Sequence, residues 1–193
     1  MAFRIEEEIG TMRVRGAEPI MMTPKLYQEL AMRTKGNEFT DRELMLNAAL
    51  GLCGETTEFS YTLSREFRNN SDEENKKELG DIEWYVALMC DVCKIDIEGI
   101  FNDTHKVDFE TKTSMCYLAG ELADYFKKVY FQGHELEKVI ISNYLKHMQS
   151  LIEKVCYIKE YDIQEIWQMN IDKLKKRYPD GFEVERSVNR EVK

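Results

Sequence analysis

The chain has 193 residues, enough for one domain or two small fused halves, and 43% of them are hydrophobic, which predicts a folded globule. It carries 36 acidic and 27 basic residues, a formal net charge of -9, so its surface would repel nucleic-acid backbones and anionic membranes. Only 10 Gly and 3 Pro interrupt it, which favours long helices over a turn-rich β fold.

Start and stop signals predict seven helices, at about residues 25–34, 41–67, 72–93, 97–109, 112–131, 134–159 and 163–177. Thr23-Pro24 and Asp162 are N-terminal caps, and the capping boxes Thr40–Glu43 and Ser71–Glu74 start two long helices. Apolar residues recur at three- and four-residue spacing within these segments. The sequence therefore predicts an all-α fold.

Segments without helical periodicity flank and separate these helices. Residues 1–22 are expected to form an irregular arm, and residues 179–193 a polar tail that begins at Pro179. Asn69-Asn70 breaks the chain between two long helices, and Gly133 marks another turn.

Targeting signals and disulfides are not expected. No apolar run approaches the ~18 residues that a membrane span needs, and the opening MAFRIEEEIG lacks a secretory pattern. Cys90 and Cys93 form a C-x-x-C, but no second Cys or His pair has zinc-ligand spacing. We therefore expect reduced cysteines in a cytoplasmic protein that binds neither nucleic acid nor membranes.

Two pairs of carboxylates stand out, each with its members three residues apart and thus on one face of a helix. The pairs are Glu55 with Glu58, and Glu78 with Asp81. Acidic pairs on helices are usually just solvated, but these sit beside small residues in otherwise apolar helices, and no Lys or Arg has helical spacing suited to neutralising all four. If the helices fold back on each other, the pairs surround a space for a hard cation such as Mg²⁺, which prefers oxygen ligands.

Three runs then resemble one family. LNAALGLCGETTEF, KKELGDIEWYVALM and NIDKLKKRYPDGF look like the MazG-like, all-α nucleoside triphosphate pyrophosphohydrolases. YQELAMRT and the tail DGFEVERSVNRE look like the smaller, often phage- or prophage-borne members. The resemblance implies an antiparallel helical bundle that uses Mg²⁺, or Mn²⁺, to cleave a nucleoside triphosphate to the monophosphate and pyrophosphate.

The resemblance also implies residue roles. As metal ligands it implies Glu55, Glu58, Glu78 and Asp81, with Glu55 or Glu58 orienting or deprotonating the attacking water. Asn170 and Lys173 are expected to contact substrate phosphates, and Arg177 follows in the same run.

Base recognition is expected from residues that precede the first acidic pair. Asn47 lies two turns before Glu55 on nearly the same face, and its amide suits a base edge. Further candidates for a base or sugar pocket are Tyr27, Gln28 and Arg33. The two tryptophans, Trp84 and Trp167, would either stack on a base or pack in the core, and helical spacing favours the core.

The segment from Asp103 to Met169 departs from the family pattern. In smaller members IDIEGIF would be followed directly by the NIDKLKKRYP segment. This segment echoes the first half at a constant offset: residues 120–124 resemble 54–58 (120 − 54 = 66), and 162–166 resemble 96–100 (162 − 96 = 66). At that offset Tyr144 and His147 stand where Glu78 and Asp81 would be, so the second copy is degenerate.

A duplication would divide the chain into two tandem helical halves, 23–110 and 111–178, that emulate the dimer of one-copy family members. Chance similarity between amphipathic helices is the alternative. The sequence leaves open whether such a chain forms a further homodimer.

Competing functions remain at this stage. A dimeric-type dUTPase, which also hydrolyses dUDP, uses similar acidic pairs on a related helical fold. A catalytically idle module that binds a nucleotide or a protein, or a structural bundle, would have no need for four close carboxylates.

Overall fold

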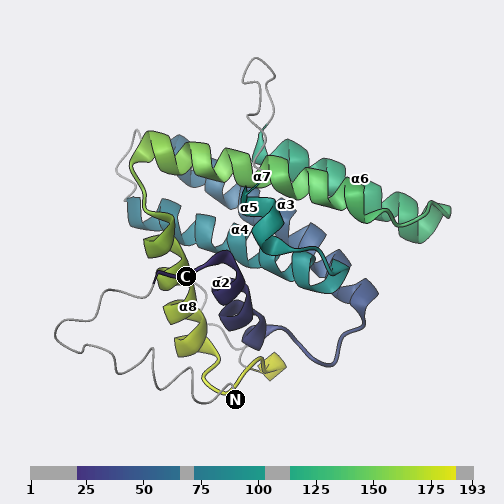
Figure 1. Ribbon diagram of the computed structural model, residues 1–193, viewed down its shortest axis with the longest axis horizontal. Coiled ribbons are helices and arrows are strands. Elements are labelled where there is room, and N and C mark those ends of the chain that lie inside the picture. Colours follow the sequence, from purple (N-terminus) through teal and green to yellow (C-terminus); the bar gives the residue numbers. More distant parts are fainter. Residues whose placement is uncertain (1–20, 66–71, 103–113, 186–193) are drawn as a thin grey trace.

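The computed structural model describes residues 21–65, 72–102 and 114–185 (Figure 1). Within these residues it contains seven α-helices, one 3-10 turn and no strand, so the predicted all-α class is confirmed. The elements are α2 (Pro24–Ala31), η1 (Met32–Thr34), α3 (Asp41–Arg65), α4 (Asp72–Cys93), α5 (Ile97–Asn102), α6 (Met115–Gln132), α7 (Lys138–Lys159) and α8 (Ile163–Arg177).

Local capping chemistry sets several helix starts. The hydroxyl of Thr23 accepts a backbone N–H of the first turn of α2. At α3 the backbone N–H of Thr40 donates to Glu43 Oε2 at 2.8 Å, and that of Glu43 donates to Thr40 Oγ1 at 3.3 Å, which confirms the predicted capping box. Asp162 caps α8 through its carboxylate, as predicted.

The start of α7 was predicted wrongly. The helix begins at Lys138 rather than near residue 134. Gly133, with φ 77°, ends α6 in a left-handed conformation, and its N–H donates to the Lys128 carbonyl. The N–H of Glu137 then donates to the Tyr125 hydroxyl at 2.6 Å, which holds the linking segment away from helical geometry.

Some predictions fall outside the described residues. These include the arm up to residue 20, the break at Asn69-Asn70, the helix beyond residue 102 and the tail beyond residue 185. The predicted start of the fifth helix at about residue 112 is wrong, because Ser114 is extended and caps a helix, α6, that begins at Met115. None of the described helices is long and apolar enough to cross a membrane.

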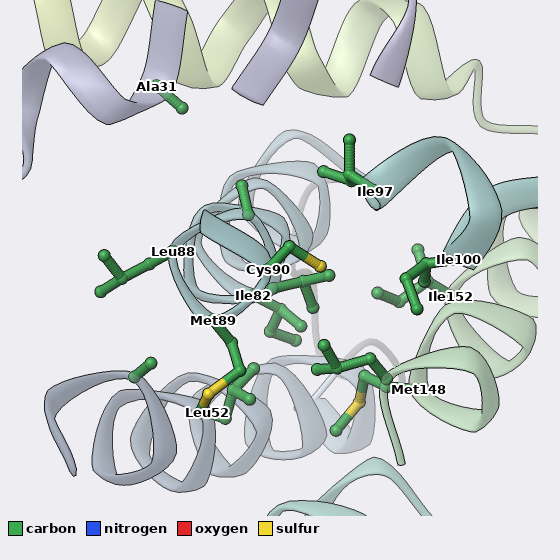
Figure 2. Packing of buried hydrophobic residues seen from close by; sticks show 14 of the residues in the cluster. Ala31, Leu52, Ile82, Leu88, Met89, Cys90, Ile97, Ile100, Met148 and Ile152 are labelled. Atoms are coloured by element: carbon green, nitrogen blue, oxygen red, sulfur yellow. The ribbon is translucent and has the colours of Figure 1, made fainter. Parts of the chain in front are cut away.

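Helix α4 lies at the centre of the bundle. Figure 2 looks nearly along it and shows its buried side chains facing those of four surrounding helices. In Figure 1, α6 and α7 run side by side along one edge, and α2 and α8 lie together on the other side of α4. The labelled neighbours of α4 in Figure 2 are Leu52 (α3), Ile97 and Ile100 (α5), Met148 and Ile152 (α7), and Ala31 (α2).

The backbone repeats at the spacing noted in the sequence. Helix α7 begins and ends 66 residues after α4 (138 − 72 = 66; 159 − 93 = 66), and α8 begins 66 residues after α5 (163 − 97 = 66). Lys94 and Glu160 take the same left-handed conformation, with φ 54° and 56°. The N–H that follows each donates to the carbonyl of Cys90 or Cys156 at 2.9 Å.

Packing crosses between the two helix pairs of this pattern, α4 with α5 and α7 with α8. Helix α8 packs against α4, and α5 packs against α7. The second helix of each pair thus lies on the first helix of the other pair. Side chains on α8 are in this way brought to the acidic face of α4.

Candidate functional site

Carboxylates from α3 and α4 meet across the interface of these two helices. Glu55 and Glu58 lie one turn apart on α3, and Glu78 lies on α4. One carboxylate oxygen of each lies within 4.8 Å of the others. Glu58 is exposed, whereas Glu55 and Glu78 are half-buried. The fold therefore brings together three of the four residues expected to bind metal.

A close helix contact sets the spacing between α3 and α4. A Cβ added at Gly51 would lie 2.2 Å from the ring of Tyr85 on α4, a distance that no side chain tolerates. Gly51 precedes Glu55 by one turn, so the tight contact lies directly beside the acidic cluster. Glycine at this position leaves room for the Tyr85 ring between the two helices.

Asp81, the fourth expected ligand, lies next to the cluster and is bonded to α8. Its Oδ1 accepts a hydrogen bond from Asn170 Nδ2 at 3.1 Å and one from the Lys173 ammonium. Gly80 makes this contact close, because a Cβ there would lie 3.0 Å from Asn170 Cβ. Asp81 is thus shared between the acidic cluster and the two polar residues of α8.

Tyr27 completes a buried chain of polar groups behind Asp81. Its hydroxyl donates to Asn170 Oδ1 at 3.0 Å and lies 3.4 Å from the Gly80 carbonyl oxygen. Burial, followed by the charges of Glu83 and Asp81, raises the pKa of Tyr27 well above its usual value, so the hydroxyl stays protonated. The amide of Asn170 is therefore fixed, with its oxygen towards Tyr27 and its nitrogen towards Asp81.

Burial and the neighbouring carboxylates both act on Glu55. Burial first, and then the charges of Asp81, Glu58 and Glu78, raise the pKa of Glu55 to about 7. Lys173 acts in the opposite direction but does not offset them. A divalent cation among these oxygens would supply positive charge.

The remaining predicted substrate residues are spread over three elements. Asn47 is exposed on α3, Arg33 is exposed in η1, and Arg177 is half-buried one turn after Lys173 on α8. Gln28 is buried, and its Nε2 donates to the Ala87 carbonyl at 3.0 Å. That bond holds α2 on α4, so the prediction that Gln28 lines a base pocket is not supported.

Both tryptophans pack inside the protein, as their spacing favoured. Trp84 Nε1 donates to the carbonyl of Ala31 and to the hydroxyl of Thr34. Trp167 is buried and stacks on Tyr27, with ring centroids 5.2 Å apart. The ring of Trp167 is therefore not open for stacking on a base, whereas Trp84 is half-buried.

Glu83 is a buried carboxyl that the sequence analysis missed. It is fully buried on α4, facing Gln149 of α7 and Trp167 of α8. Burial raises its pKa to about 8, although the donors of Gln149 and Trp167 lower it in part. The available signal was its helical spacing, four residues after Leu79 and three before Val86, both of which are buried.

The second acidic pair, 66 residues further on, has different neighbours. Glu121 is exposed on α6, and Asp124 forms ion pairs with Lys127 and with Lys128, the latter at 2.7 Å. These lysines lower the pKa of Asp124 to about 2. Tyr144 of α7 lies near this pair. Burial first, and then the charge of Glu121, raise the pKa of the Tyr144 hydroxyl.

Comparisons with protein-family models, curated proteins and solved structures found no match to this chain. The functional assignment therefore rests on the residues of the chain, their geometry and the sequence resemblance.

Proposed function

We propose that this chain is a divalent-metal-dependent nucleoside triphosphate pyrophosphohydrolase, with its site between α3, α4 and α8. The observation that carries the proposal is the convergence of Glu55, Glu58 and Glu78 from two helices, with their oxygens within 4.8 Å. The resemblance to the MazG-like family supplies the reaction, because these residues match its metal-binding pairs.

The donor set suits Mg²⁺ or Mn²⁺. All of the converging atoms are carboxylate oxygens, which hard divalent cations prefer. The pKa of Glu55 is raised by burial first and then by the charges of Asp81, Glu58 and Glu78, and a cation beside it would oppose the effect of these charges. When bound, such a cation screens the triphosphate and makes a bound water more acidic. Glu55, Glu58 and Glu78 would hold it, with Asp81 beside them.

Residues of the chain would perform the remaining tasks. One carboxylate of the α3 pair, Glu55 or Glu58, orients and deprotonates the water that attacks the α-phosphorus. Lys173, with Arg177 one turn further along α8, neutralises charge on the departing pyrophosphate. Asn47 projects from the exposed part of α3, two turns before Glu55, and is retained as the candidate contact to the base.

Asn170 takes a different role from the one implied by resemblance. Its side chain is 3% exposed, and both of its polar atoms are engaged, with Tyr27 and with Asp81. It therefore holds Asp81 in place rather than contacting a phosphate.

The chain is further proposed to be a tandem duplication that acts as a pseudo-dimer. The recurring helix bounds and the paired left-handed residues Lys94 and Glu160 support this proposal. So does the reciprocal packing of α8 on α4 and of α5 on α7. In this arrangement the first half supplies the carboxylates, and the second half supplies Asn170 and Lys173.

The test is product analysis with a panel of canonical, deoxy and modified triphosphates, each with Mg²⁺ and with EDTA. Metal-dependent formation of a monophosphate and pyrophosphate would support the proposal, whereas release of inorganic phosphate would contradict it. Strong preference for dUTP, with dUDP also cleaved, would move the assignment to the dUTPase type. Absence of turnover with Mg²⁺ bound would leave a nucleotide-binding module.

A further inference from the structure

Lys173 is a positive group beside the acidic cluster. It forms an ion pair with Asp81, and its charge acts on Glu55. Its side chain is 23% exposed and that of Asp81 is 27% exposed, so the pair lies at the edge of the site and not in the core. The ammonium therefore already supplies part of the charge that a metal would bring.

One oxygen atom carries both contacts from α8. Asp81 Oδ1 accepts from Asn170 Nδ2 and from the Lys173 ammonium. A carboxylate oxygen offers about two lone-pair directions, so a cation that binds this oxygen must take the place of one of the two donors, whereas Oδ2 keeps its own lone pairs. Asn170 cannot easily leave, because it is buried and its oxygen accepts from Tyr27. Lys173, on a long flexible stem, can leave.

We infer that Lys173 is an internal counter-ion that exchanges with a divalent cation at Asp81, and that the exchange releases its ammonium to bind a phosphate. The inference rests on the proposed function, because it concerns the same site. It makes cation and polyphosphate binding cooperative: the cation displaces Lys173 from Asp81, and the displaced ammonium is then available to a phosphate oxygen. Asn170 keeps Asp81 oriented during the exchange.

The chain provides a matched control in Lys35. Its ammonium pairs with Asp91 Oδ2 at 2.6 Å, with side chains 25% and 29% exposed, close to the values for Lys173 and Asp81. Lys35 and Asp91 do not belong to the acidic cluster, so we expect a cation at the cluster to leave this ion pair intact.

The first experiment measures lysine accessibility in the wild-type protein. Brief acetylation with and without Mg²⁺, without nucleotide, is read by peptide mass spectrometry. We expect labelling of Lys173 to rise roughly threefold or more with Mg²⁺, because release of the ion pair frees the amine. Labelling of Lys35 should not change. Unchanged or reduced labelling of Lys173 with Mg²⁺ bound would overturn the inference and leave the metal site standing.

The second experiment measures Mg²⁺ affinity by calorimetry without nucleotide. K173M should bind Mg²⁺ roughly three- to tenfold more tightly than wild type, since the competing cation is gone. K35M should bind like wild type. In wild type, pyrophosphate should bind more tightly in the presence of Mg²⁺, and K173M should lose the part of that coupling that exceeds direct contact between the cation and the phosphate. Equal Mg²⁺ affinity of K173M and wild type would contradict the exchange, whereas no Mg²⁺ binding to wild type would overturn both proposals.

Discussion

Glu55 and Glu58 on α3 occupy the same relative positions as Glu121 and Asp124 on α6, but their surroundings differ. In the first half a third carboxylate, Glu78, completes the group, and the pKa of Glu55 rises to about 7. In the second half lysines of the same helix pair with the aspartate, and the pKa of Asp124 falls to about 2.

The difference comes from residues one turn away. Asp124 has Lys127 and Lys128 after it, whereas the corresponding positions of the first half hold Tyr61 and Thr62. A pair that carries its own lysines is neutralised within its helix and needs no further cation. The first pair lacks them and depends on a charge from elsewhere, which α8 supplies in part through Lys173.

The largest effect should follow from removing one charge of the first cluster. E58Q or D81N should lower kcat by roughly a thousandfold or more while the helical content stays unchanged, because each removes a charge that the reaction requires. Circular dichroism and pyrophosphate release measure the two outcomes. The double variant E121Q/D124N is the matched control and should keep turnover within about twofold, since its surface charges contribute little. Full activity in both E58Q and D81N would refute the assignment.

The second prediction concerns the close contact between Gly80 of α4 and Asn170 of α8, which lies beside the first acidic pair. G80A inserts a methyl group 3.0 Å from Asn170 Cβ, so Asn170 must give way by a few tenths of an ångström. We expect unfolding to become easier by about 1–3 kcal/mol, as for overpacked cores, together with weaker catalysis. G120A meets open space and should instead stabilise its helix by up to about 1 kcal/mol. Urea denaturation of both variants measures these changes in stability. Equal stability of G80A and wild type would show that the contact between Gly80 and Asn170 is loose.

The raised pKa of Glu55 predicts how stability depends on pH when divalent cations are absent. Between its usual pKa of 4.5 and about 7, the folded protein binds more protons than the unfolded chain. The free energy of unfolding should therefore fall as pH rises through this window, by about 1–2 kcal/mol after allowance for solvent screening.

The raised pKa of Glu83 also makes the free energy of unfolding fall with pH, up to about pH 8. Wild type must therefore be compared with E55Q, which should remove only the contribution of Glu55. Urea denaturation in EDTA at several pH values gives both slopes. Added Mg²⁺ should stabilise wild type more at pH 8 than at pH 5, because it binds the ionised carboxylates. Identical slopes for wild type and E55Q would rule out this origin of the pH dependence.

The smallest effect is expected from Y27F, which removes the hydroxyl that orients Asn170. The buried amide oxygen loses a donor, at a cost of about 1–2 kcal/mol in stability. Because Asn170 orients Asp81, kcat/KM should also fall, by roughly three- to tenfold. Thermal unfolding and steady-state kinetics test both parts. A stability loss with unchanged kinetics would show that Tyr27 only packs.

Local signals in the sequence were sufficient for the fold class and most helix starts. The capping box at Thr40 and the cap at Asp162 are short-range chemistry, and the structure forms both as predicted. The prediction of where α7 starts was wrong because the start depends on Tyr125. This residue belongs to the preceding helix, and its hydroxyl accepts a hydrogen bond from the N–H of Glu137. Such a tertiary contact leaves no periodic signal.

The site was predictable only in part, for a similar reason. Helical spacing placed Glu55 with Glu58 on one face, and the packing of α3 against α4 brings Glu78 to them. The contacts that α8 makes to Asp81 depend on how the two halves cross, which local spacing does not report. Gln28 was assigned to substrate from its position before the acidic pair, although it packs α2 against α4.

The most direct test is a titration of Mn²⁺ followed by electron paramagnetic resonance, on wild type, E55Q/E58Q and E121Q/D124N. We expect Mn²⁺ to bind to wild type and to E121Q/D124N, and this binding to be lost in E55Q/E58Q. Mn²⁺ binding that survives in E55Q/E58Q, or that disappears in E121Q/D124N, would contradict the central claim that the first acidic pair builds the metal site.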